Sequence, residues 1–286
     1  MQNIEPTKPG TKTETTALQT TSRRSLLTAA AWSAPVLALA VAAPLAAAST
    51  LCIDPDFKID WGLASVSGTS VALGRSTPVE KIAVFTPQPG AKPGSTNIAG
   101  RVTHTFAGQM RTEATNARIS SGFVGGIGQR GYQISQHNGA STQVAPTAND
   151  VQTVTFSFEE DLYNVRFAIT DIDRMWQAGF MRTRDFIDGV VLESSAPWAA
   201  RLPVGSTVTG AGRRDAPWRN TANEDKNEDG PGGQVDVVFP GPMRSFTIRY
   251  SNLGHTEAPA MNGAPTQNTN QTIFVTGMTV ERRTVC

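Results

Sequence analysis

Residues that build catalytic centres are scarce in this sequence. It has two cysteines and three histidines among 286 residues. His104, His137 and His255 lie in no metal-ligand spacing such as H-E-x-x-H, and none is close to a cysteine. There is no G-x-S-x-G elbow for a nucleophilic serine, and a carboxylate pair would need a buried acid with a raised pKa, which a sequence does not display. These absences favour a protein that is not an enzyme.

An excess of one charge is also absent. The chain carries 25 Lys and Arg against 24 Asp and Glu, for a formal charge of +1. Residues 1–48 hold four of the basic and two of the acidic side chains, so the remainder has 21 basic and 22 acidic groups and a charge of −1. A nearly neutral chain gives no electrostatic basis for binding nucleic acid or anionic lipid. We expect neither as a partner.

After Arg24 the sequence carries no charge from Ser25 through Ala48. About 20 apolar residues suffice to cross a bilayer, so length alone permits an uncleaved anchor. Composition argues against one, because eleven of these residues are Ala, five are Leu, and Pro35 and Pro44 interrupt the segment. A buried core helix is disfavoured too, since it would carry polar residues at helical spacing.

The two ends of this stretch predict a cleaved export signal. Just before it, Arg23 and Arg24 lie in the sequence SRRSLL, which resembles the twin-arginine export signal with Leu where that pattern prefers Phe. At its other end, Ala46 and Ala48 form an A-x-A cleavage site. We expect residues 1–48 to be a signal peptide that leaves no stable membrane anchor, and the mature chain to be secreted or at the extracellular cell surface.

The two cysteines, Cys52 and Cys286, lie at the two ends of the mature chain. A disulfide between them suits an exported protein, and loop entropy would give it a ceiling of about 5 kcal/mol. The alternative is two unrelated thiols, which is less favoured because exposed thiols oxidise outside the cell. A lipid-attachment signal at Cys52 is disfavoured because bulky Leu51 precedes it.

Alternation of apolar and polar residues predicts an all-β fold. In VTFSFEEDLYNVRFAI (154–169), apolar residues alternate on both sides of EEDLYN, which predicts two strands joined by a turn. VDVVFPGPMRSFTIRY (235–250) repeats the same apolar spacing, because of either a duplicated unit or two packed sheets with strand pairs of similar length. Further strands are predicted at 81–85, 101–106, 132–135, 186–192 and 272–280.

Many short strands separated by turn residues indicate an antiparallel β-sandwich, immunoglobulin-like or jelly-roll-like, over residues 49–286. The connections at 86–97, 138–150, 208–234 and 251–272 are long, and 138–150 is an alternative subdomain boundary. Long loops are where binding residues are expected.

The stretch from VTFSFEEDLYNVRFAITDID through DFIDGVVLE to VDVVFPGPMRSFTIRYSN resembles β-sandwich domains of exported bacterial surface proteins. The leader, with AAAWSAPVLALA, is similar to leaders of such proteins. The resemblance covers residues 150–285 and implies a surface or secreted protein with no defined enzymatic activity.

The sequence GIGQRG (126–131) has the G-x-G-x-x-G spacing of a dinucleotide-binding loop. That motif needs a helix N-terminus after it, whereas YQIS follows here and reads as a strand. A glycine-rich turn is the favoured interpretation.

A calcium loop is suggested by DKNEDGPGGQVD (225–236). Asp225, Asn227, Asp229 and Asp236 take positions 1, 3, 5 and 12 of an EF-hand-type loop, with Gly230 at position 6. Position 12 is normally a longer Glu, and a strand rather than a helix follows. A solvated acidic loop is the alternative.

Asp171 and Asp173 form a second, weaker candidate for calcium. Lying two residues apart, they would project to one face of a strand while Ile172 points into the core. They are interpreted either as exposed carboxylates or as a calcium site assisted by Asp185 or Asp188.

Three tryptophans, Trp176, Trp198 and Trp218, fall in or near loops, where they would either stack on sugar rings or cover an edge of the core.

The sequence as a whole predicts an exported, non-catalytic β-sandwich protein whose loops bind an extracellular protein or a glycan. The alternative is a carbohydrate-binding module or a carbohydrate-active enzyme. The expected cofactor is Ca²⁺ or none.

Overall fold

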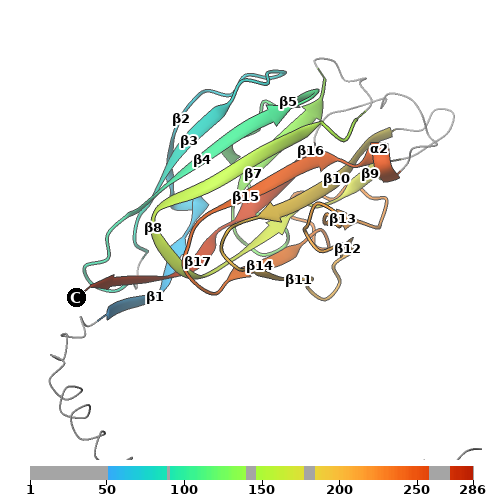
Figure 1. Cartoon of the computed structure of the whole chain (residues 1–286). Helices are drawn as coiled ribbons and strands as arrows, with labels where there is room; N and C mark the ends of the chain where they lie inside the picture. The colour runs from blue at the N-terminus through green and yellow to red at the C-terminus, as the bar shows by residue number, and fades with distance from the viewer. Residues whose placement is uncertain (1–50, 89–90, 140–145, 177–183, 258–270, 286) are drawn as a thin grey trace, which may run out of the picture. The chain divides into compact units, whose positions relative to one another are not determined.

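Antiparallel strands make up most of the described part of the chain, as a computed structural model shows (Figure 1). It describes residues 51–88, 91–139, 146–176, 184–257 and 271–285. The export-signal residues Arg23, Arg24, Ala46 and Ala48 lie outside the described residues, as does Cys286. In the described ranges, no helix has the length and apolar character needed to span a membrane. The predicted fold class, an all-β antiparallel sandwich, is confirmed.

The elements, in chain order, are β1 Leu51–Ile59, η1 Trp61–Leu63, β2 Ser65–Gly68, β3 Val79–Phe85, β4 Ile98–Ala107, β5 Met110–Thr112, β6 Arg118–Ile119, β7 Gly131–Asn138, β8 Val151–Thr170, β9 Arg174–Trp176, β10 Arg184–Glu193, β11 Ala199–Arg201, β12 Val208–Thr209, β13 Arg219–Asn220, β14 Val235–Phe239, β15 Met243–Asn252, α2 Gly254–Glu257, β16 Gln271–Thr276 and β17 Met278–Val285.

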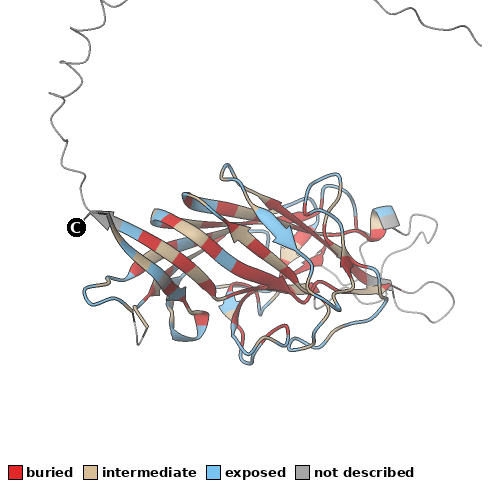
Figure 2. Cartoon of the chain, turned by 90° about the horizontal axis from the view of Figure 1, so that it is seen from below, coloured by how far each residue is buried: buried red, intermediate tan, exposed pale blue. Residues whose placement is uncertain are grey.

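The 20-residue strand β8 connects the two layers of the sandwich. Its first half lies between β4 and β15 in the order β2-β3-β4-β8-β15-β10-β9. Its second half pairs with β14 on one side and with β16 and β17 on the other. β11 extends this second group at β14, β1 extends it at β17, and β7 extends it at β16. Figure 2 shows buried and less buried residues alternating along the strands, as expected when one face of each strand packs on the core.

The predicted turn at EEDLYN is wrong, because β8 runs without a break through residues 159–164. The strand bends there instead, and Asn164 takes a left-handed backbone conformation with φ of 47°. A polar segment was mistaken for a turn because the strand crosses between layers at this point.

The two segments with the same apolar spacing pair with each other. Val237 lies opposite Phe167 in one half, and Phe246 lies opposite Phe156 in the other. Antiparallel partners that both pass through two layers need the same intervals between core residues. This pairing accounts for the repeated spacing without a duplicated unit.

Aromatic side chains fill the core at the bend. The Phe246 ring stacks on Phe156 with centroids 4.8 Å apart and on Phe167 with centroids 4.9 Å apart. All three are nearly inaccessible to solvent. Burial and ring stacking together hold the two layers against each other.

The strands predicted at 81–85, 101–106, 132–135 and 186–192 correspond to β3, β4, β7 and β10, each longer than predicted. The single strand predicted at 272–280 is wrong: the chain changes partners at Gly277, between β16 and β17. A Cβ at Gly277 would lie 2.9 Å from the Ile59 carbonyl oxygen, so this crossing favours glycine.

GIGQRG forms a turn in front of β7, as predicted, and Val124 bridges to Gln129 across it. Strand β16 pairs with both β7 and β8, so it connects the strands on either side of the 138–150 connection.

Strand β1 was missed because Pro55 interrupts its alternation, and its register with β17 shifts between Asp54 and Phe57. Its pairing brings the two ends of the described chain together, with Cys52 opposite Thr284. Cys286 lies two positions further on, so the predicted disulfide remains a prediction that this register favours.

Candidate functional site

Four aspartates from three segments meet beside the end of β8, and we call them the acidic cluster. Asp171 and Asp173 follow β8, Asp188 lies in β10, and Asp225 lies in the loop after β13. Asp171, Asp173 and Asp188 are buried, with exposed fractions of 6%, 3% and 0%. The interpretation of Asp171 and Asp173 as exposed carboxylates is therefore wrong. Ile172 between them is buried in the core, as predicted.

The loop after β13 is held against residues 172–176 by hydrogen bonds. The Lys226 amide donates to Asp173 Oδ2 (2.6 Å), and the Trp176 amide donates to Asn223 Oδ1 (2.8 Å). The Ile172 amide donates to the Gly233 carbonyl (3.0 Å). These bonds place Asp225 at the acidic cluster.

Asp188 is the most constrained carboxylate of the cluster. Its Oδ1 accepts hydrogen bonds from Tyr250 Oη (2.7 Å) and Gln271 Nε2 (3.2 Å). Its Oδ2 accepts one from the Asp173 amide (3.2 Å). Three donors fix the side chain and favour its ionised form, although burial acts in the opposite direction and raises its pKa.

Burial and mutual repulsion shift the other pKa values upward. Burial, followed by the charges of Asp173, Glu228 and Asp225, raises the pKa of Asp171 to about 9. Burial raises the pKa of Asp173 to about 7, while the hydrogen bond from the Lys226 amide lowers it. The neighbouring groups that shift Asp171 are all acidic, so the cluster has an excess of negative charge when ionised.

The residues of the predicted 225–236 calcium loop have separate partners. Asp229 Oδ1 accepts from the Gly126 amide (3.0 Å), and Asp236 Oδ2 pairs with Arg201 Nη2 (3.0 Å). The Asn227 carbonyl accepts from the Gly230 amide (2.6 Å). Within the described part of the chain, no group of three or more Asp, Glu, His or Cys side chains lies in an arrangement that could hold a metal ion. Of the predicted loop ligands, only Asp225 joins the acidic cluster.

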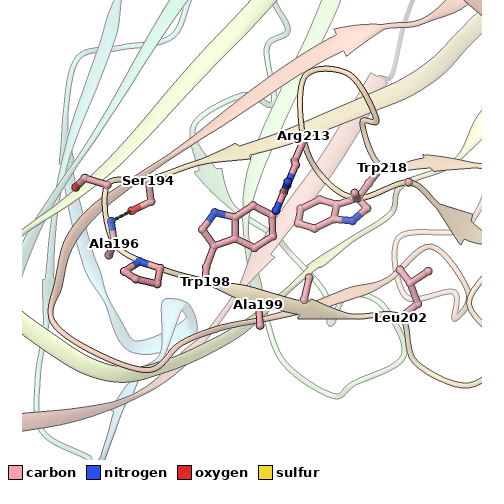
Figure 3. A pocket seen from close by; sticks show the side chains of 12 residues that line it. Ser194, Ala196, Trp198, Ala199, Leu202, Arg213 and Trp218 are labelled. Atoms are coloured by element: carbon pink, nitrogen blue, oxygen red, sulfur yellow. Dashed lines mark hydrogen bonds between the residues drawn. The ribbon is translucent and has the colours of Figure 1, made fainter. Parts of the chain in front are cut away.

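A second candidate site is the Trp198 pocket, a cavity of about 590 Å³ whose walls include Ser194, Ser195, Trp198, Leu202, Arg213 and Trp218. The connection from β10 to β11 supplies Trp198, and the segment between β12 and β13 supplies Arg213. Figure 3 shows the two indoles next to each other, with Arg213 directed toward them. Their ring centroids are 5.7 Å apart at an interplanar angle of 65°.

Trp218 supports this pocket, whereas Trp198 is open to it. Trp218 is 1% exposed, and its backbone exchanges two hydrogen bonds with Val190 of β10, both 2.9 Å long. Trp198 is only partly buried and packs against the edge of the core. Its indole is the one positioned to contact a ligand.

Gly212 permits the close packing behind the pocket. It has a φ of 67°, and a Cβ there would lie 2.4 Å from the Trp218 ring. Only glycine meets both demands without strain.

The third predicted tryptophan, Trp176, lies elsewhere. It is buried against Ile187 and Leu253 and takes no part in the Trp198 pocket.

The sequence analysis named all four aspartates of the acidic cluster, divided between two calcium candidates, and it named the tryptophans. It missed Tyr250, Gln271 and Arg213. Tyr250 continues the apolar alternation of β15, so the sequence pattern gave no indication that its hydroxyl group donates a hydrogen bond to Asp188. Arg213 was one of many polar residues in a long loop.

Comparison of the chain with known protein families, with curated proteins and with solved structures finds no match.

Proposed function

We propose that the mature chain is an exported, non-catalytic β-sandwich protein that binds a glycan in the Trp198 pocket. The observation that carries this proposal is the partly exposed indole of Trp198 on the wall of a 590 Å³ cavity. Cavities of roughly 300–1,000 Å³ with aromatic walls and a few polar groups are typical of small-molecule sites. A flat indole face offers a sugar ring a large apolar contact at little entropic cost.

Polar groups around the indole suit a ligand rich in hydroxyls. Ser194 and Ser195 contribute hydroxyl groups to the wall. Arg213 is exposed, whereas its neighbour Arg214 pairs with Glu193 at 2.5 Å. A guanidinium donates several hydrogen bonds in one plane, which favours a sugar that carries a carboxylate or other anionic group.

A binding role is favoured over hydrolysis by the lining of the pocket. The described residues that line it include no Asp, Glu, His or Cys. Glycoside hydrolysis normally uses two carboxyl groups that flank the sugar bond. The alternative of a carbohydrate-active enzyme therefore has no acid in this pocket to act through.

Affinity electrophoresis of the purified protein tests the proposal, with gels containing xylan, mannan, mixed-linkage β-glucan or polygalacturonate. We expect at least one polysaccharide to retard the wild type, and Trp198→Ala to migrate unretarded. Phe123→Ala is the matched control, because Phe123 is an aromatic residue 56% exposed and outside the pocket.

The proposal fails if no polysaccharide retards the wild type, or if Trp198→Ala is retarded equally. Incubation of the wild type with the bound polysaccharide should release no new reducing ends. Their appearance would replace the binding function with an enzymatic one.

Export and a Cys52–Cys286 disulfide belong to the same proposal. The pairing of β1 with β17 supports the disulfide because it brings the ends of the mature chain together. N-terminal sequencing of secreted protein should begin after Ala48, and mass spectrometry of non-reduced peptides should find the two cysteines linked. An intact N-terminus on membrane-bound chain would refute the export signal.

A further inference from the structure

We propose that the acidic cluster binds one calcium ion, with Asp171, Asp173 and Asp225 as carboxylate ligands and Asp188 as the residue that positions them. This inference is independent of glycan binding in the Trp198 pocket. It differs from the calcium loop suggested by sequence spacing, since only Asp225 belongs to both.

The first observation is that carboxyl groups of the cluster act on one another at close range. Asp188 Oδ2 accepts a hydrogen bond from the Asp173 amide (3.2 Å), and the charge of Asp225 raises the pKa of Asp173. Ionised carboxylates at close range repel each other unless a proton, water or a cation lies between them. A cation would hold all of them in the ionised form that three donors already favour at Asp188.

The second observation is independent of these contacts. Asp171 is 6% exposed, and its Oδ1 has no hydrogen-bond partner among the described residues. A buried carboxylate oxygen without a partner costs several kcal/mol unless something compensates it. Asp171 also has a φ of 65°, a left-handed conformation that is strained for a residue other than glycine.

The nearby cationic side chain does not compensate Asp171. Lys226 Nζ pairs with Glu224 Oε2 at 2.5 Å, and the groups that act on the charge of Asp171 are Asp173, Glu228 and Asp225. The groups that shift the pKa of Asp171 are therefore all acidic, which favours an added cation.

The ligand chemistry selects calcium among the common metals. The cluster offers only oxygen atoms, without His or Cys, and so suits a hard cation rather than zinc. Ca²⁺ takes six to eight oxygen ligands in flexible geometry. Three carboxylates would supply part of this coordination, and backbone carbonyls and water would supply the rest. As the side chains lie, no three of them are arranged to hold an ion, so the proposal requires the Asp225 side chain to turn toward Asp171 and Asp173. Asp225 is exposed and gives the ion a route from solvent.

Thermal melting of the purified protein in EDTA, in 5 mM Ca²⁺ and in 5 mM Mg²⁺ tests the site. With dissociation constants typical of extracellular modules, Ca²⁺ should raise the melting temperature by about 2–9 °C. Mg²⁺ should raise it less, because it demands stricter geometry. Calorimetric titration with CaCl₂ should give one site per chain.

Variants separate the two calcium sites. Asp171→Asn with Asp225→Asn should abolish the Ca²⁺ shift yet melt in EDTA at or above the wild-type temperature, because the change removes repulsion and keeps shape. Asp229→Asn with Asp236→Asn is the matched control and should keep the full shift.

The proposal is overturned if Ca²⁺ leaves the wild-type melt unchanged, or if the first double variant keeps the shift. Loss of the shift only in the control would assign calcium to the 225–236 loop instead. If the first double variant fails to fold, the single variant Asp225→Asn at the exposed position must lower calcium affinity at least 10-fold. Unchanged affinity in it would also overturn the proposal.

Discussion

The paired strands at the centre of the molecule and the segment that follows β8 bury different kinds of side chain. In β8, β14 and β15 the side chains at alternate positions are apolar and buried, and Phe246 packs between Phe156 and Phe167. Beyond the end of β8, Asp171 and Asp173 are buried although both are acidic. Burial of apolar side chains stabilises the centre, whereas burial of the two carboxyl groups costs free energy unless other groups compensate it.

The largest effect is expected at the centre. Phe246→Ala should lower the free energy of unfolding by about 3–5 kcal/mol, because it removes a buried ring and leaves a cavity between two stacked neighbours. Urea unfolding measures the change. Phe246→Leu, which keeps most of the volume, should cost clearly less. Equal losses would mean that the ring packing does not hold the layers together.

The next effect belongs to the acidic cluster in EDTA and depends on pH. The Asp171 pKa is about 9 in the folded protein and 3.8 ordinarily, so between these values the folded state binds more protons than the unfolded state. Stability must then fall as pH rises, by at most about 1.4 kcal/mol per unit. From pH 6 to pH 8 we expect a loss of about 2 kcal/mol.

Asp171→Asn is the control for this slope, because its side chain does not titrate. Its stability should change less with pH in denaturant titrations over the same range, and the slope that remains is the part due to Asp173, whose pKa is about 7. Coincident profiles for the variant and the wild type would show that Asp171 is already ionised in the folded state.

A smaller effect is expected behind the Trp198 pocket. Gly212→Ala should cost about 1–2 kcal/mol, because its Cβ would lie 2.4 Å from the Trp218 ring at a positive φ. It should also weaken glycan retardation. Gly241→Ala is the matched control, since a Cβ there meets nothing within 4 Å. If the two variants melt alike, the pocket is more tolerant than its packing indicates.

The smallest effect on stability is expected at Arg213. Arg213→Gln should change the free energy of unfolding by less than about 0.5 kcal/mol, because the residue is exposed. Binding is the informative measurement: retardation by polygalacturonate should weaken more than retardation by neutral mannan. An equal change in retardation by both polysaccharides would contradict the role of Arg213 in recognising an anionic sugar.

The alternation of apolar and polar residues predicted strands most accurately where one face of the strand is buried. The alternation in 235–239 and 246–250 predicted β14 and β15 because period-2 spacing has no other regular explanation. It failed at β8, where the polar residues 159–164 read as a turn, and at β1, where Pro55 breaks the pattern. Both failures lie where the chain bends or shifts register to meet partners distant in sequence.

The sequence by itself determined the β-sandwich class, the predicted export signal and the presence of acidic residues at 171–173 and 225–229. Each depends on neighbours in the chain: side-chain alternation, a charged residue pair before an apolar run, and short spacing. Only the tertiary structure decided that Asp225 meets Asp173 while Asp236 pairs with Arg201, and that Trp198 rather than Trp176 lines a cavity. Those outcomes follow from strand register and from the docking of long loops, because the contacts join residues whose positions along the chain set no constraint on their distance.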